Sequence, residues 1–241
     1  MTAILHIETS TRVCSVGVSV DGAMAALREE HSQNYSHSSV LTTFVQEVLR
    51  EAGLAMKQLS AVAVSMGPGS YTGLRIGVSA AKGICYGLEI PLIAVDTLQA
   101  LAWHTRQVIR DSQQAGAPLF PDVIYCPMID ARRMEVYYNL FDHEIKPLGE
   151  TRAQIIEAAT FDSIPAQKTM LVMGDGAEKC RQVIRRQHIR FLPQVLPSVK
   201  GMLPLAQQKW EQKAFEDVAY FEPFYLKDFI AGPSRVKGLK S

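Results

Sequence analysis

A glycine-rich segment between Met66 and Ala81 constrains the fold of this chain more than any other part of its sequence. The short, β-branched run Ala61 to Val64 precedes it and is typical of a buried strand. Gly67-Pro68-Gly69 then interrupts that run, as a tight turn would. From Thr72 to Gly87 the pattern is helical. The segment therefore predicts a strand that switches into a helix through a turn.

One side of this predicted helix carries almost no side-chain bulk. Small residues recur there at spacings of three and four, which places them on a common face: Gly73, Gly77, Ala80 and Ala81. A glycine inside a helix costs about 1 kcal/mol relative to alanine, so close packing should offset that cost. Two interpretations stay open: the thin face lies flat on its own sheet, or it receives a helix of another protein.

The turn does not match the common phosphate-binding motifs. A helix N-terminus attracts anions, but a P-loop also needs lysine and then serine or threonine directly after its last glycine. Here Gly73 is followed by Leu74 and Arg75. The spacing of Gly67, Gly69 and Gly73 does not fit a dinucleotide fingerprint either. The sequence therefore predicts neither of these two nucleotide sites.

Composition limits the class of protein. With 241 residues, of which 47% are apolar and 20% charged, the chain can bury a substantial core. Its net charge of +1 argues against tight binding to nucleic acid through bulk charge alone. No run approaches 18 apolar residues and the N-terminus is similar to a strand, so we expect a cytoplasmic protein with no membrane contact. Four separated cysteines are expected to be reduced core residues: Cys14, Cys85, Cys126 and Cys180.

The first half of the chain predicts three strands followed by alternating helices and strands. Asp21-Gly22 is a strong signal for a two-residue hairpin between the second and third strands. The predicted strands are Ala3 to Glu8, Val13 to Val20, Ala23 to Glu30, 61 to 66 and Leu92 to Val95, and the predicted helices are Ser38 to Ala52, Thr72 to Gly87 and Thr97 to Asp111. This order is expected for a ribonuclease H-like unit.

A related order begins again after a polar, proline-bounded stretch from Asp111 to Pro121. The predicted strands there are Val123 to Asp130, Glu135 to Asp142 and Met170 to Met173, and the predicted helices are Gln154 to Ala159 and Ala177 to Arg186. We therefore expect an α/β fold of duplicated ribonuclease H-like units, with mixed sheets flanked by helices. The predicted boundaries are 1–111 and 112–241, with the second unit smaller and degenerate.

Specific motifs add a family resemblance. The motifs are Ile7-Glu8-Thr9-Ser10-Thr11, the segment from Gly67 to Gly77, Ala81-Lys82-Gly83, Asp130-Ala131-Arg132-Arg133 and Pro223-Phe224-Tyr225-Leu226-Lys227. Together they resemble the bacterial TsaB family, formerly called YeaZ, within the actin, sugar kinase and Hsp70 superfamily. The first strand departs from the family pattern because it ends in Glu8, where aspartate is common.

The resemblance implies a role in making threonylcarbamoyladenosine, the modified nucleoside beside the anticodon of certain tRNAs. It implies a non-catalytic subunit that binds the catalytic paralogue TsaD, in a complex that the small ATPase TsaE joins. ATP and metal are then expected in the partner subunits, with no cofactor in this chain, and tRNA is reached only through the complex.

A helix-on-helix interface is the binding mode that this interpretation favours. The helix from Ser38 to Ala52 would present large apolar side chains to the partner, and the glycine-alanine helix would present gaps above its small residues. The predicted interface residues are Val40, Leu41, Phe44, Val48, Gly73, Gly77, Ala80, Ala81 and Ile84. A homodimer through the same surface is possible when the partner is absent.

The alternative is an ATP-dependent small-molecule kinase of the actin-like superfamily. Such an enzyme needs an acidic residue at the end of its first strand and hydroxyls beside it. Glu8, Thr9 and Ser10 could supply these groups, and Gly174-Asp175-Gly176 could touch a nucleotide. We favour instead that the hydroxyls after Glu8 close a hairpin turn between the first two strands, and Gly174-Asp175-Gly176 could simply form a turn before the next helix. No catalytic set can be assembled from spacing, and no metal site is predicted, because His31 and His37 are six residues apart in a polar stretch.

Overall fold

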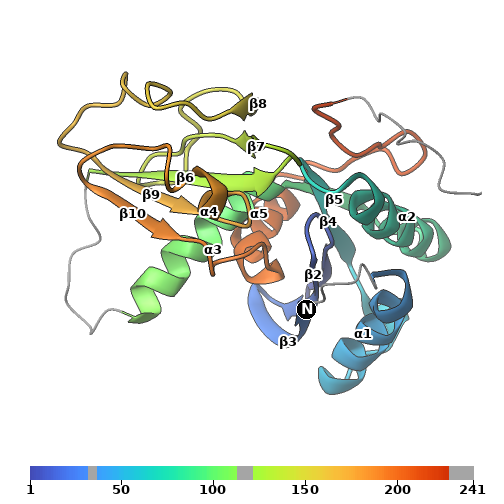
Figure 1. Cartoon of the computed structure of the whole chain (residues 1–241). Coiled ribbons are helices and arrows are strands. Elements are labelled where there is room, and N and C mark those ends of the chain that lie inside the picture. The colour runs from blue at the N-terminus through green and yellow to red at the C-terminus, as the bar shows by residue number, and fades with distance from the viewer. Residues whose placement is uncertain (32–36, 113–121, 228–241) are drawn as a thin grey trace, which may run out of the picture.

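Two five-stranded mixed sheets form the centre of the protein in a computed structural model, which describes residues 1–31, 37–112 and 122–227 (Figure 1). The first sheet has the order β3-β2-β1-β4-β5. Its strands are β1 (Ala3–Glu8), β2 (Val13–Val20), β3 (Ala23–His31), β4 (Ala61–Gly67) and β5 (Leu92–Asp96). The first three strands are antiparallel, whereas β4 pairs in parallel with both β1 and β5. Because β1 is central, it is buried on both faces, including its two polar residues His6 and Glu8.

The second sheet repeats this plan with shorter strands. Read from its far edge, the order is β8-β7-β6-β9-β10. The strands β6 to β10 therefore occupy, in sequence order, the places that β1 to β5 occupy in the first sheet. The strands are β6 (Val123–Asp130), β7 (Glu135–Tyr138), β8 (Arg152–Ile155), β9 (Thr169–Met173) and β10 (Ile189–Leu192). The predicted duplication of ribonuclease H-like units, with a reduced second copy, is therefore confirmed.

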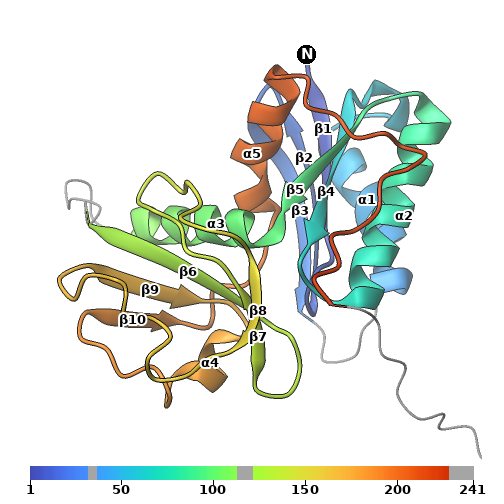
Figure 2. The same ribbon diagram turned by 90° about the horizontal axis from the view of Figure 1, so that it is seen from above.

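The two units exchange one helix each. α1 (His37–Glu51) and α2 (Tyr71–Leu88) cover one face of the first sheet. α5 (Val199–Glu211), which follows β10, packs on the other face of that sheet, whereas α3 (Thr97–Ser112), which follows β5, packs on the second sheet (Figure 2). α3 and α5 cross where Gly201 lies against Ala100, since a Cβ at Gly201 would be 2.0 Å from the Ala100 carbonyl oxygen. The strands of the first sheet thus lie between Ala3 and Asp96 and those of the second between Val123 and Leu192, while α5 returns to the first sheet.

Three expectations for the second unit need correction. The helix predicted from Gln154 to Ala159 is wrong, because Arg152–Ile155 is the edge strand β8, which pairs with β7. The helix predicted from Ala177 to Arg186 shrinks to one turn, α4 (Ala177–Cys180). The strand predicted from Glu135 to Asp142 ends at Tyr138. A further short helix, η1 (Met56–Gln58), precedes β4.

The C-terminal segment crosses back over the first unit. Residues 216–227, here called the C-terminal strap, run beside β5 and α2 (Figure 2). Glu216 begins the strap by donating its backbone N–H to the Leu92 carbonyl at 2.9 Å, on the edge strand. The predicted stretch Asp111 to Pro121 lies mostly outside the described residues, as does the basic end of the sequence after Lys227.

Candidate functional site

The turn between β4 and α2 is built around glycines. Gly67 adopts φ +113°, a conformation that side chains disfavour, and a Cβ there would lie 2.7 Å from the Phe224 carbonyl oxygen. Ser70 caps α2, because its Oγ accepts the N–H of Gly73 at 3.3 Å. The turn therefore starts α2 at a fixed place above the end of β1.

The thin face of α2 is occupied by the chain itself. A Cβ at Gly73 would lie 2.1 Å from the carbonyl oxygen of Thr9, and one at Gly77 would lie 2.3 Å from Thr9 Oγ1. The Thr9 hydroxyl donates to the Gly73 carbonyl at 2.8 Å. These two glycines hence allow α2 to lie flat on β1, the first of the two interpretations. They do not form open depressions for another subunit.

Three other predicted interface residues also belong to the core. Leu41 and Val48 of α1 are 3% and 0% exposed, and Ala81 of α2 is 0% exposed. All three pack with β1 and β4 in one apolar cluster. The large side chains that α1 was expected to present to a partner therefore point mostly towards its own sheet.

The outward surface of the helix pair contains the remaining predicted residues. Val40, Phe44, Ala80 and Ile84 are half-buried and pack against the rim of the first apolar core. Sequence reasoning missed their neighbours on α2, which are Thr72, Ile76, Ser79 and Gly83. The helical period gave a signal for them, since positions 72, 79 and 83 lie opposite the buried side of α2. We call these eight residues the outward α1–α2 surface.

Two glycines of α2 have nothing packed against them. A Cβ at Gly83 or Gly87 would meet no atom within 4 Å, and both residues are exposed. The open part of the helix with little side-chain bulk is thus its outer side, and not the face that the sequence suggested.

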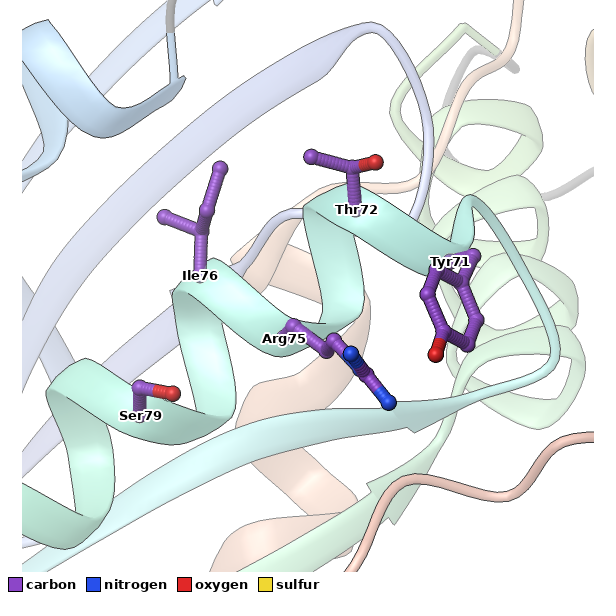
Figure 3. A pocket seen from close by; sticks show the side chains of 5 residues that line it. All are labelled: Tyr71, Thr72, Arg75, Ile76 and Ser79. Atoms are coloured by element: carbon purple, nitrogen blue, oxygen red, sulfur yellow. The ribbon is translucent and has the colours of Figure 1, made fainter. Parts of the chain in front are cut away.

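A shallow hollow of about 420 Å³ lies at the start of this surface. Tyr71, Thr72, Arg75, Ile76 and Ser79 line it, with Tyr71 and Arg75 side by side on one flank of α2 (Figure 3). The Arg75 guanidinium lies 4.1 Å from the centre of the Tyr71 ring, a cation–π distance.

The residues of the alternative kinase site are closed off. Glu8, Thr9 and Ser10 are all 0% exposed beneath the turn that precedes α2. Glu8 Oε1 accepts the N–H of Ser10 at 2.6 Å, while Glu8 Oε2 and Ser10 Oγ have no hydrogen-bond partner. Burial raises the pKa of the Glu8 carboxyl above its usual value, because the charged form is poorly solvated there. These groups are therefore enclosed by other described residues and do not line an open surface.

Gly174-Asp175-Gly176 forms a turn against β6. Gly174 adopts φ +98°, and a Cβ there would lie 2.3 Å from the Met128 carbonyl oxygen. Asp175 Oδ1 accepts the N–H of Asp130 at 3.0 Å, so its carboxylate is engaged in holding the turn. The two glycines are explained by this close approach of two backbones.

Metal and membrane sites find no support in residues 1–31, 37–112 and 122–227. No group of three histidine, cysteine or acidic residues is arranged to hold an ion within these ranges. The same ranges contain no helix with the length and apolar character needed to cross a membrane. All four cysteines are buried as free thiols. The stretch between His31 and His37 lies outside the described residues.

Comparison with known proteins agrees with the motifs. The family described as "TsaD: tRNA N6-adenosine threonylcarbamoyltransferase" matches residues 29–232. The tRNA threonylcarbamoyladenosine biosynthesis protein TsaB of Escherichia coli K12 is 28% identical over 95% of this chain and 96% of its own length. TsaB of Buchnera aphidicola subsp. Acyrthosiphon pisum is 30% identical over 87% of this chain and 90% of its own.

A solved structure shares the whole fold. YeaZ from Pseudomonas aeruginosa superposes with a TM-score of 0.77 at 26% identity, covering 94% of this chain and 100% of that one. The chain therefore belongs to the TsaB (YeaZ) family of tRNA threonylcarbamoyladenosine biosynthesis proteins.

Proposed function

We propose that this chain is a non-catalytic subunit that binds a TsaD-family paralogue through the outward α1–α2 surface. The observation that carries the proposal is the pair of unpacked glycines on the exposed side of α2. Each costs the free helix about 1 kcal/mol relative to alanine and gains no contact in return. A partner helix that approaches closely would supply the missing contacts, together with the half-buried Val40, Phe44, Ala80 and Ile84.

The chemistry is assigned to the partner. The buried state of Glu8, Thr9 and Ser10 supports a chain without a reactive centre or a cofactor of its own. In this proposal TsaD and the ATPase TsaE supply metal and ATP, tRNA is bound through the assembly, and the complex works in the cytoplasm. In the absence of TsaD, the same surface would pair two copies of this chain.

Substitution at Gly83 tests the interface. Gly83→Arg places a long side chain on the outward surface, where the free protein has room for it. We expect the variant to fold but to lose co-elution with the TsaD-family subunit from the same organism in size-exclusion chromatography. Gly149→Arg is the matched control, because a Cβ at Gly149 also meets nothing within 4 Å and the residue lies in the second unit. Unchanged co-elution of folded Gly83→Arg would remove this surface from consideration.

The kinase alternative has its own measurement. Calorimetric titration of the isolated protein with Mg-ATP should show no binding at Glu8, Thr9 and Ser10. Binding that Glu8→Gln abolishes would favour the kinase instead.

A further inference from the structure

The strap is attached to the end of β4 and to α2 through several polar contacts. Phe224 donates its backbone N–H to the Met66 carbonyl at 2.7 Å, beside the glycine turn. Lys82 Nζ donates to the carbonyls of Ala219 and Phe221 at 3.1 and 2.9 Å. The strap thus runs along one flank of α2 and leaves the outward α1–α2 surface open.

Arg75 is fixed where the strap meets α2. Its Nε donates to the Tyr225 hydroxyl at 3.0 Å, and its guanidinium lies 4.1 Å from the Tyr71 ring centre. The Tyr71 and Tyr225 rings lie 5.0 Å apart, so they support each other. An arginine held in this way has lost most of its freedom before any ligand arrives.

The guanidinium is exposed. The Tyr225 hydroxyl and, among the charged groups, the nearby Glu222 carboxylate raise the pKa of Arg75, but Glu222 does not come within ion-pair distance of it. Among the residues that the structure describes, no carboxylate forms an ion pair with Arg75. Its two terminal nitrogens are not used by Tyr225, which takes only Nε. Arg75 is also the single charged residue among the five that line the hollow in Figure 3.

We propose that Arg75 is a recognition residue for an aspartate or glutamate side chain of the partner subunit. The inference rests on the proposed function, because it names the chemistry that the same surface selects. A planar guanidinium with two free terminal nitrogens binds a carboxylate through paired hydrogen bonds. The hydroxyls of Thr72 and Ser79 and the apolar Ile76 complete the hollow, so the ion pair would be shielded from water on one side. Tyr225 is then a positioning residue that aims the guanidinium.

Conservative variants test this role. The affinity of the full chain for the TsaD-family subunit is measured by calorimetry at two salt concentrations. Arg75→Lys keeps the charge but loses the planar guanidinium that can form paired hydrogen bonds. We expect the affinity for the TsaD-family subunit to fall by about tenfold. Tyr225→Phe removes only the hydroxyl that orients Arg75, and we expect a smaller loss. The salt dependence of binding should weaken in Arg75→Gln, because one ion pair is gone.

Two matched controls separate recognition from general damage. Tyr220→Phe changes a tyrosine of the same strap that is 84% exposed, and Arg185→Lys changes an exposed arginine of the second unit. Both should bind as the original protein does. If Arg75→Lys also binds with unchanged affinity while Gly83→Arg abolishes binding, this inference is wrong and the proposed interface stands. If Gly83→Arg binds normally too, the proposed function itself fails.

Discussion

At the scale of single residues, the polar groups at the end of β1 serve the fold. Thr9 supports α2 through the Gly73 carbonyl, and Glu8 closes the turn through the N–H of Ser10. His6 is 0% exposed and bonds to Ser19 Oγ at 2.8 Å through Nε2. Residue types that could serve catalysis on an open surface are here parts of a sealed core. Sequence alone could not separate the two roles, because both need the same residues at the same strand end.

His6 predicts a specific pH dependence of stability. Burial lowers the pKa of His6 from 6.5 to about 3, so the unfolded chain binds a proton between these values and the folded chain does not. The contribution of neutral His6 is complete above pH 6.5 and is lost as the pH falls towards 3. Between pH 7 and pH 5 we expect a loss of about 2 kcal/mol in the free energy of unfolding.

Comparison with His6→Gln isolates this effect in urea titrations. Glu8 and the other titrating groups are common to both proteins, so their contributions cancel. The stability advantage of the original protein should shrink by about 2 kcal/mol from pH 7 to pH 5. An advantage that stays constant over this range would show that His6 is not buried as a neutral group.

At the scale of elements, α2 has glycines on two faces that differ in the space available for a side chain. Its inner face needs glycine, because a side chain at Gly77 would collide with Thr9 Oγ1. Its outer face has room for side chains at Gly83 and Gly87. A single helix therefore contains glycines that the fold requires and glycines that the fold alone does not explain.

This difference predicts opposite effects on stability. Gly77→Val should destabilise the protein by about 2 kcal/mol or more, since backbone and side chain must shift. Gly83→Ala should raise the free energy of unfolding by about 0.5 to 1 kcal/mol, because alanine favours the helix and meets no neighbour. Thermal unfolding of the two variants measures both changes. Destabilisation by Gly83→Ala would contradict the open environment of that residue.

The elements of the first unit could be predicted from sequence more fully than those of the second. Periodicity placed α1 and α2 to within one residue at each end, because long amphipathic helices carry a repeated signal. The four-residue strand β8 gave too short a pattern, and its pairing with β7 overrode the local helical appearance. α5 was not predicted, since Gly201 and Pro204 weaken its helical signal. In the candidate site, the sequence assigned the inner face of α2 to a partner, whereas Gly73 and Gly77 pack against Thr9 of the same chain; the choice of α1 and α2 as the binding helices stays a prediction.

At the scale of the whole molecule, the duplication is asymmetric in a way that suits a single partner site. Each unit contributes a sheet of the same order and one exchanged helix. Within residues 1–31, 37–112 and 122–227, two long helices lie side by side on one face of a sheet in the first unit alone, α1 and α2. In the second unit, turns replace the counterpart of α1 between β8 and β9, and α4 is one turn long. The part of the chain that the structure describes therefore has one such helix pair, and the proposed interface predicts one partner subunit per chain.

The central claim is that this chain contributes a binding surface and no chemistry. The most direct test is tRNA modification in a mixture of the chain, its TsaD-family subunit and TsaE, supplied with tRNA, Mg-ATP and an activated donor of the threonylcarbamoyl group. Glu8→Gln preserves the shape of the buried turn and removes the carboxylate that a magnesium-dependent reaction would need, so modification should continue at the original rate. Gly83→Arg should reduce modification to the level seen without this chain. Loss of modification with folded Glu8→Gln, or full modification with Gly83→Arg, would contradict the account.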